Sequence, residues 1–223
     1  MSDKNIIEKI DKIMEMYKRG ELGGEIMPED SNPHLNKDSL ENYLYYTLPM
    51  ALNYQRNSYT LWESALNTYI DKETNFVFNP EQCLKHPLCK TFMKLFNGDI
   101  RKLFDDLDND IEKIRDFIQN KNKKEFPYLS GIKICNYWLY VIYQYTGRKY
   151  KNIHKITVAP DTHVCKATLK LGVITEEEFN SNDVQLIVAE KWEKLLEKTK
   201  YKPIDIHTQL WLWSRNGFRE IAN

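Results

Sequence analysis

Apolar residues recur at intervals of three and four along almost the whole chain, and the strict apolar–polar alternation of a half-buried strand is almost absent. Near the start, for example, Ile6, Ile10, Ile13 and Tyr17 fall on one side of a helix. The segment 132–145 is so apolar that it must lie at the centre of the fold. This spacing predicts an all-α protein.

Glycines and prolines divide the chain into the expected helices. A loop rich in both follows the first helix, Asn79-Pro80 is a favourable helix start, and Thr175 with Glu178 forms a capping-box pattern. We expect a basic loop at 121–125 and a short extended segment at 153–159. The expected helices span 3–19, 38–52, 58–71, 132–145, 161–172, 182 or 183 to 199, and 203–218, with shorter ones between 79 and 121.

The overall charge gives no reason to expect a nucleic-acid or membrane partner. The 223 residues suffice for one large domain or two closely packed lobes, and 32 basic residues balance 32 acidic ones. Basic clusters occur at 121–124 and 148–151, and an acidic run occupies 105–110. We expect these runs to offset one another from separate parts of a dipolar surface, the alternative being that each is a solvated helix end or loop.

Several classes of protein are disfavoured. No segment approaches the roughly 18 apolar residues that span a bilayer, and the N-terminus lacks a signal-peptide core. Four irregularly spaced cysteines are typical of buried, reduced thiols in an intracellular protein. The segment 83–89 holds two of them and one histidine but lacks a convincing fourth zinc ligand. We therefore expect no metal and no organic cofactor.

Residues 129–133, Leu-Ser-Gly-Ile-Lys, form the pattern of a tight hairpin that opens the apolar helix. Backbone N–H groups of Ser130, Gly131 and Ile132 at a helix start suit a phosphate oxygen, and glycine allows close approach. Lys133 places an ammonium where it opposes the helix dipole, and burial would lower its pKa toward that of a nucleophile. The alternatives are an ordinary helix connection and a lysine that extends to solvent.

Asp161 follows Pro160 at the expected start of another helix. Aspartate is a favoured N-cap worth about 1 kcal/mol. A carboxylate there can also stabilise oxocarbenium character while a glycosidic bond breaks, or activate the attacking amine or water. The two roles are compatible, because the cap would hold the carboxylate in place.

Three motifs together resemble the helix-hairpin-helix DNA glycosylase superfamily, and within it the archaeal 8-oxoguanine DNA glycosylase family, AGOG. The resemblance covers roughly residues 38–216 and leaves residues 1–35 without a clear role. The motifs are Gly-Ile-Lys-Ile-Cys-Asn-Tyr at 131–137, Ala-Pro-Asp-Thr-His-Val at 159–164, and Pro-Ile-Asp-Ile-His-Thr-Gln-Leu-Trp-Leu-Trp-Ser-Arg at 203–215.

The resemblance implies a two-lobed all-α fold, with the active cleft between the lobes, in which 1–223 is one glycosylase unit and 121–172 holds the hairpin and catalytic segment. The family flips a damaged purine out of double-stranded DNA and cleaves its N-glycosidic bond, and a lysine can then nick the strand through a Schiff base. By position, Asp161 matches the catalytic aspartate, and Trp62, Lys133 and Trp211 match the base pocket. The resemblance further implies a monomer located in the cytoplasm at the nucleoid.

The chain departs from the family at two positions. Phe126 stands where the family has its nucleophilic lysine, so Lys123, Lys124 or Lys133 would have to substitute, or the lyase step is missing. His207 stands where the family has a pocket aspartate, which leaves the preference for 8-oxoguanine open. The alternatives are a DNA-binding protein that has lost catalysis and an N-glycosidase for another modified nucleobase.

Overall fold

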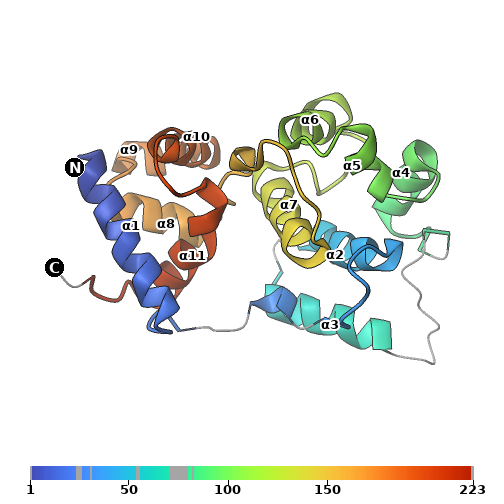
Figure 1. Ribbon diagram of the computed structural model, residues 1–223, viewed down its shortest axis with the longest axis horizontal. Coiled ribbons are helices and arrows are strands. Elements are labelled where there is room, and N and C mark those ends of the chain that lie inside the picture. Colours follow the sequence, from blue (N-terminus) through green and yellow to red (C-terminus); the bar gives the residue numbers. More distant parts are fainter. Residues whose placement is uncertain are drawn as a thin grey trace. The chain divides into compact units, whose positions relative to one another are not determined.

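The computed structural model describes residues 2–23, 27–30, 32–53, 56–70, 80–81 and 83–221. These residues are mostly helical and contain no β-strand, which confirms the all-α prediction (Figure 1). The chain forms two compact units: unit 1 comprises residues 1–25 and 154–223, and unit 2 comprises residues 26–153.

Unit 1 is built around the pairing of helices α8 and α11. Its helices are α1 (Asp3–Lys18), α8 (Thr162–Lys170), α9 (Glu176–Phe179), α10 (Val184–Leu196) and α11 (His207–Arg215), with the 3-10 turn η4 (Pro203–Ile206) before α11. Helix α11 packs against both α8 and α1. The fully buried Trp192 donates its indole N–H to Thr168 Oγ1 at 2.9 Å. Helix α1, whose role the sequence left open, therefore belongs to the core of this unit.

Unit 2 is built around the expected central helix. Its elements are η1 (Pro28–Asp30), α2 (Leu40–Leu52), α3 (Ser58–Ile70), α4 (Pro87–Phe96), α5 (Arg101–Asp106), α6 (Ile111–Asp116), the π-helical turn η2 (Phe117–Lys121) and α7 (Ile132–Thr146). Helix α7 packs on α2, and the buried Trp138 donates its indole N–H to Thr47 Oγ1 at 3.0 Å. The turn η1 packs on α3.

Most helix starts lie within a few residues of their predicted positions, and the capping box at Thr175 and Glu178 is present. The start predicted at Asn79-Pro80 is wrong for Pro80, which lies in a turn, while Asn79 falls outside the described residues. The helix begins instead at Pro87, where the imidazole Nδ1 of His86 accepts the N–H of Leu88. The segment expected to be extended from 153 begins with the 3-10 turn η3 (Ile153–Lys155).

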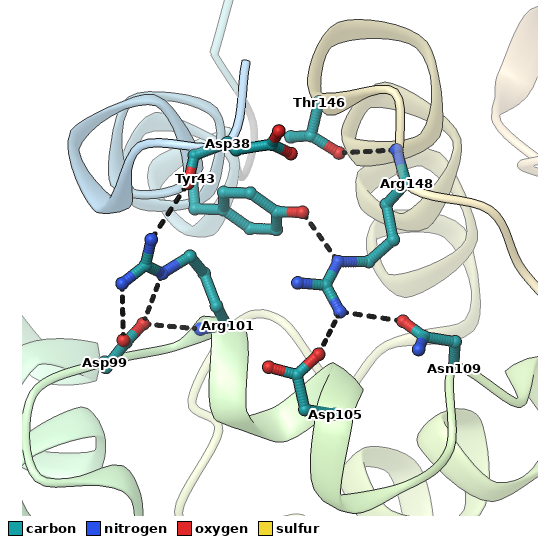
Figure 2. Close-up of polar contacts among 8 residues, drawn as sticks. All are labelled: Asp38, Tyr43, Asp99, Arg101, Asp105, Asn109, Thr146 and Arg148. Atoms are coloured by element: carbon teal, nitrogen blue, oxygen red, sulfur yellow. Dashed lines mark hydrogen bonds and ion pairs between the residues drawn. The ribbon is translucent and has the colours of Figure 1, made fainter. Parts of the chain in front are cut away.

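The predicted separation of acidic and basic runs is wrong for the basic run at 148–151. Figure 2 shows the guanidinium of Arg148, just after α7, bound to Asp105 at 2.5 Å, Asn109 at 2.7 Å and the Tyr43 hydroxyl at 2.6 Å. Lys151 of the same basic turn pairs with Asp108 at 2.6 Å. This basic run meets the acidic run because the turn after α7 lies against the loop between α5 and α6, so these charges pair locally.

Candidate functional site

Asp161 is the N-cap of α8, as its position in the sequence predicted. Its Oδ1 accepts the N–H of Val164 at 2.8 Å, and its own N–H donates to the carbonyl of Ala159 at 2.7 Å. The residue is partly exposed. One carboxylate oxygen is thus fixed by the cap at the positive end of the helix dipole. The catalytic role of this carboxylate stays a prediction.

His207 opens α11 and is only 4% exposed. Its Nδ1 accepts the backbone N–H of Ala159 at 3.3 Å, so the ring must be neutral with its proton on Nε2. This contact holds the backbone two residues before Asp161. A contact from His207 to a base would therefore have to use Nε2. The structure shows that His207 positions the backbone before Asp161, and its role in a base pocket stays a prediction.

The two tryptophans of α11 have different surroundings. Trp213 is buried, packs against Phe218 and donates its indole N–H to the carbonyl of Arg219 at 2.8 Å. Trp211 is partly exposed, meets the ring of His163 edge-on at 5.9 Å, and lies under the guanidinium of Arg215 at 4.7 Å. Trp211 is therefore the one of the pair with an accessible surface.

The predicted hairpin is a tight turn anchored by the buried side chains of Phe126 and Leu129. The N–H groups of Leu129 and Ser130 both donate to the carbonyl of Phe126. Gly131 is the exposed N-cap of α7, and a Cβ atom there would meet nothing within 4 Å. Ser130 and Ile132 are partly exposed. The surface at the start of α7 is thus open enough for a phosphate to approach, and its DNA-binding role stays a prediction.

The candidate lysines lie on either side of this hairpin. Phe126, at the family's nucleophile position, is completely buried and meets the ring of Phe117 edge-on at 6.1 Å. Lys124 is exposed in the turn before it, and Lys133 is partly exposed in the first turn of α7. Both side chains reach the surface, so the amine of either lysine is accessible to a substrate.

Trp62 of α3 is completely buried in unit 2. Its ring is tilted against those of Tyr45 and Tyr46, each at 5.8 Å, and no described residue accepts a hydrogen bond from its indole N–H. A buried donor without a partner costs about 1–3 kcal/mol, so such a group needs an explanation. The contact of Trp62 with a flipped base stays a prediction.

Sequence reasoning missed Glu29, which lies in the 3-10 turn η1 and is 1% exposed. Its Oε1 accepts the hydroxyl of Tyr137 at 2.6 Å, while Oε2 is buried and has no hydrogen-bond partner among the described residues. Burial raises the pKa of the Glu29 carboxyl to about 7, opposed by the hydrogen bond from Tyr137. Nothing in a helical periodicity could have found this residue, because η1 is a three-residue turn in a loop.

Tyrosine side chains from helices α2 and α7 lie near this carboxyl. Tyr46 of α2 stacks on Tyr145 of α7 at 4.5 Å, and the Tyr145 hydroxyl donates to Asp30. Burial, together with the nearby Glu29 charge, raises the pKa of the Tyr46, Tyr137 and Tyr145 hydroxyls, so these phenols stay neutral.

The predicted site residues divide between the two units: Asp161, His207 and Trp211 belong to unit 1, and Trp62, Lys124, Ser130, Gly131, Ile132 and Lys133 belong to unit 2.

All four cysteines are buried thiols, as expected. Across the part of the chain that the structure describes, no three His, Cys, Asp or Glu side chains are grouped to hold a metal ion. Within the same part, no helix is both long and apolar enough to cross a membrane.

The chain was compared with protein-family models, with curated proteins and with solved structures, and none of the three comparisons gives a match.

Proposed function

We propose that the protein is a helix-hairpin-helix DNA glycosylase that removes an oxidised purine, with 8-oxoguanine as the first candidate. The observation that carries the proposal is the anchoring of Asp161. Its carboxylate is held by Val164 at the start of α8, and the backbone leading to it is held by His207. A fixed, partly exposed carboxylate is what stabilising a developing oxocarbenium ion requires, because it needs no reorganisation during the reaction.

In the proposed reaction the bond between purine N9 and sugar C1′ breaks, and the electron pair leaves with the base. The Asp161 carboxylate stabilises the positive charge that develops on the sugar and accepts a proton from the attacking nucleophile. That nucleophile is water in a glycosylase without lyase activity. It is the amine of Lys133 or Lys124 in an enzyme that also nicks the strand.

Binding in this proposal uses the hairpin and the aromatic residues. Backbone N–H groups of Gly131 and Ile132 hold a phosphate of double-stranded DNA, whereas the N–H of Ser130 is already bonded to the carbonyl of Phe126. By the resemblance, the residues that contact the flipped base are Trp211 and His207 of unit 1, and Trp62 and Lys133 of unit 2. The proposal includes a two-lobed helix-hairpin-helix fold, a monomeric state and a place at the nucleoid.

Borohydride trapping on a duplex with one 8-oxoguanine tests this function. Wild type, Lys124→Gln and Lys133→Gln are compared, with Lys149→Gln, an exposed lysine of the basic turn, as the matched control. An adduct lost in only one of the two test variants identifies the nucleophile. Alkali-revealed abasic sites without an adduct identify a glycosylase that uses water and Asp161.

The second candidate is a DNA-binding protein without catalysis, which the burial of Phe126 at the nucleophile position favours. It predicts neither adduct nor abasic sites, together with equal affinity for damaged and undamaged duplex. Release of a different modified base would instead support an N-glycosidase with another substrate.

A further inference from the structure

Unit 2 contains a groove of about 870 Å³ that is lined by helices α2 and α3 and by the turn that leads into α4. Its apolar side chains include Leu48 and Leu52 of α2, Leu61 and Ala65 of α3, and Leu84 of the turn. Helices α2 and α3 pack against each other within unit 2 (Figure 1). The volume lies in the range of about 300–1,000 Å³ that is typical of small-molecule sites, and none of the residues assigned above to DNA or base binding lines it.

The groove exposes apolar surface that an apolar ligand would cover. Leu52 is 36% exposed and Leu84 is 48% exposed, and both line the groove. On α3, Leu61, Ala65 and Thr68 are four and three residues apart, so they share one face of the helix. An aliphatic chain in the groove would remove these side chains from water, which is favourable because apolar surface is poorly solvated.

The charged side chains of the groove carry an excess of positive charge. Arg56 and Lys85 line it together with one acidic residue, Glu81, and all three are exposed. Neither cation forms an ion pair within the part of the chain that the structure describes. The planar guanidinium of Arg56 can bind both oxygens of a carboxylate, and Lys85 supplies a second positive charge. The groove therefore favours a ligand with an anionic group.

His86 also lines the groove but adds no charge to it. Its Nδ1 accepts the N–H of Leu88 at 3.2 Å, and its Nε2 donates to the carbonyl of Leu48 at 3.1 Å. Burial lowers the pKa of this imidazole, which keeps the ring neutral. Because both ring nitrogens are used within the fold, recognition of an anion falls to Arg56 and Lys85.

We propose that this groove binds a free fatty acid, with the aliphatic chain between α2 and α3 and the carboxylate at Arg56 and Lys85. The ligand matches the apolar walls with its chain and the excess positive charge with its head group. A cationic amphiphile with the same chain would be repelled by the two side chains that attract a carboxylate. The groove is separate from the proposed glycosylase residues, so this inference does not rest on the proposed function.

Calorimetry of the full chain with octanoate, decanoate and dodecanoate, each below the concentration at which it forms micelles, measures the binding. We expect each additional pair of CH₂ groups to lower the dissociation constant by about tenfold, because each pair buries more apolar surface. Dodecyltrimethylammonium, which has the same chain as a dodecyl amphiphile but the opposite charge, should bind about tenfold more weakly than dodecanoate.

Three variants locate the site. Ala65→Phe fills the groove from α3 and should weaken dodecanoate binding by about tenfold or more. Arg56→Gln combined with Lys85→Gln should bring the two dodecyl ligands close to equal affinity while the dependence on chain length persists. The matched control is Lys90→Gln combined with Lys102→Gln, which removes two exposed lysines outside the groove lining and should bind like the wild type.

The proposal is overturned if the wild type binds none of the carboxylates, binds the two dodecyl ligands equally, or shows an affinity independent of chain length. Unchanged binding by a folded Ala65→Phe variant would also overturn it. Binding to vesicles of anionic phospholipid but not to dodecanoate would assign the groove to a membrane surface instead. Self-association that Ala65→Phe abolishes would assign it to a second copy of the chain. The double variant of Arg56 and Lys85 changes only exposed side chains, so it tests the proposal even if Ala65→Phe does not fold.

Discussion

The backbone N–H of Ala159 donates to Nδ1 of His207, 48 residues later in the chain, at 3.3 Å. This bond joins the segment that leads into Asp161 to the first residue of α11. Because Ala159 and His207 are both buried, the donor cannot turn to solvent if the imidazole is removed. The motif at 203–215 thus holds the motif at 159–164 in position through this bond, whether or not His207 also contacts a base.

His207→Ala should therefore weaken both the fold and the reaction. The orphaned N–H of Ala159 costs about 1–3 kcal/mol, which lowers the melting temperature by several degrees. Base release should slow while duplex affinity stays close to that of the wild type, and the ranking of modified bases should change if the ring also contacts the base. His207→Asn, which keeps an acceptor near the position of Nδ1, is the matched control and should recover most of the stability. Wild-type melting by His207→Ala would show that the bond is unimportant.

Asp161 can be tested with two substitutions that separate its cap from its charge. Asparagine caps helices about as well as aspartate but carries no charge, whereas alanine loses the cap at a cost of about 1 kcal/mol. Asp161→Asn should lower the single-turnover rate of base release by about a hundredfold or more while stability and duplex affinity stay unchanged. Asp161→Ala should lose both activity and stability. Unimpaired turnover by Asp161→Asn would remove this carboxylate from the mechanism.

Arg148 should contribute more to the stability of unit 2 than other surface cations. Its side chain is 16% exposed and binds Tyr43 of α2, Asp105 of α5 and Asn109 of the loop after α5 (Figure 2). The guanidinium also lies over the rings of Tyr43 and Phe104. Lysine cannot reproduce this planar set of donors, so Arg148→Lys should destabilise the protein by about 1–3 kcal/mol in urea unfolding.

The control for Arg148 is Lys151→Gln. Lys151 forms an ion pair at 2.6 Å with Asp108, but both side chains are about 60% exposed, at 61% and 58%. Exposed pairs contribute about 0–1 kcal/mol, so this variant should unfold close to the wild type. Equal effects of the two substitutions would contradict the special role of Arg148.

The sequence predicted what depends on local pattern. Asp161 as an N-cap and the capping box at Thr175 follow from side chains that bond backbone groups three residues away. The apolar helix from Ile132 needs only its composition and the glycine before it. A local pattern can also mislead. The helix start predicted at Pro80 was wrong because an Asn-Pro pair is as compatible with a turn as with a helix.

Features that join distant segments could not be predicted in this way. The contacts of Arg148 with Tyr43 and of Ala159 with His207 span 105 and 48 residues, and no periodicity encodes them. Glu29 is the clearest case, since a glutamate in a loop is normally exposed. It is buried because η1 packs against α3, and Tyr137, 108 residues later, supplies its hydrogen bond.

That burial makes the stability of the protein depend on pH in a predictable direction. The Glu29 carboxyl has a pKa of about 7 in the fold, against 4.5 for an unperturbed glutamate. Below about pH 4.5 the group is protonated in both states, and the fold has its full stability. As the pH rises toward 7, the unfolded chain releases the proton while the folded chain keeps it, so the free energy of unfolding falls. Above 7 both states are ionised and the loss is complete.

Glu29→Gln keeps the size of the side chain and removes this titration. The free energy of unfolding of the wild type should therefore fall relative to Glu29→Gln by about 3 kcal/mol between pH about 4.5 and pH about 8. Urea unfolding of both proteins at several pH values measures the difference, and groups elsewhere in the chain cancel because the two proteins share them. If the difference between the two proteins were independent of pH, or if it grew in favour of the wild type as pH rose, Glu29 would not be a buried carboxyl with a raised pKa.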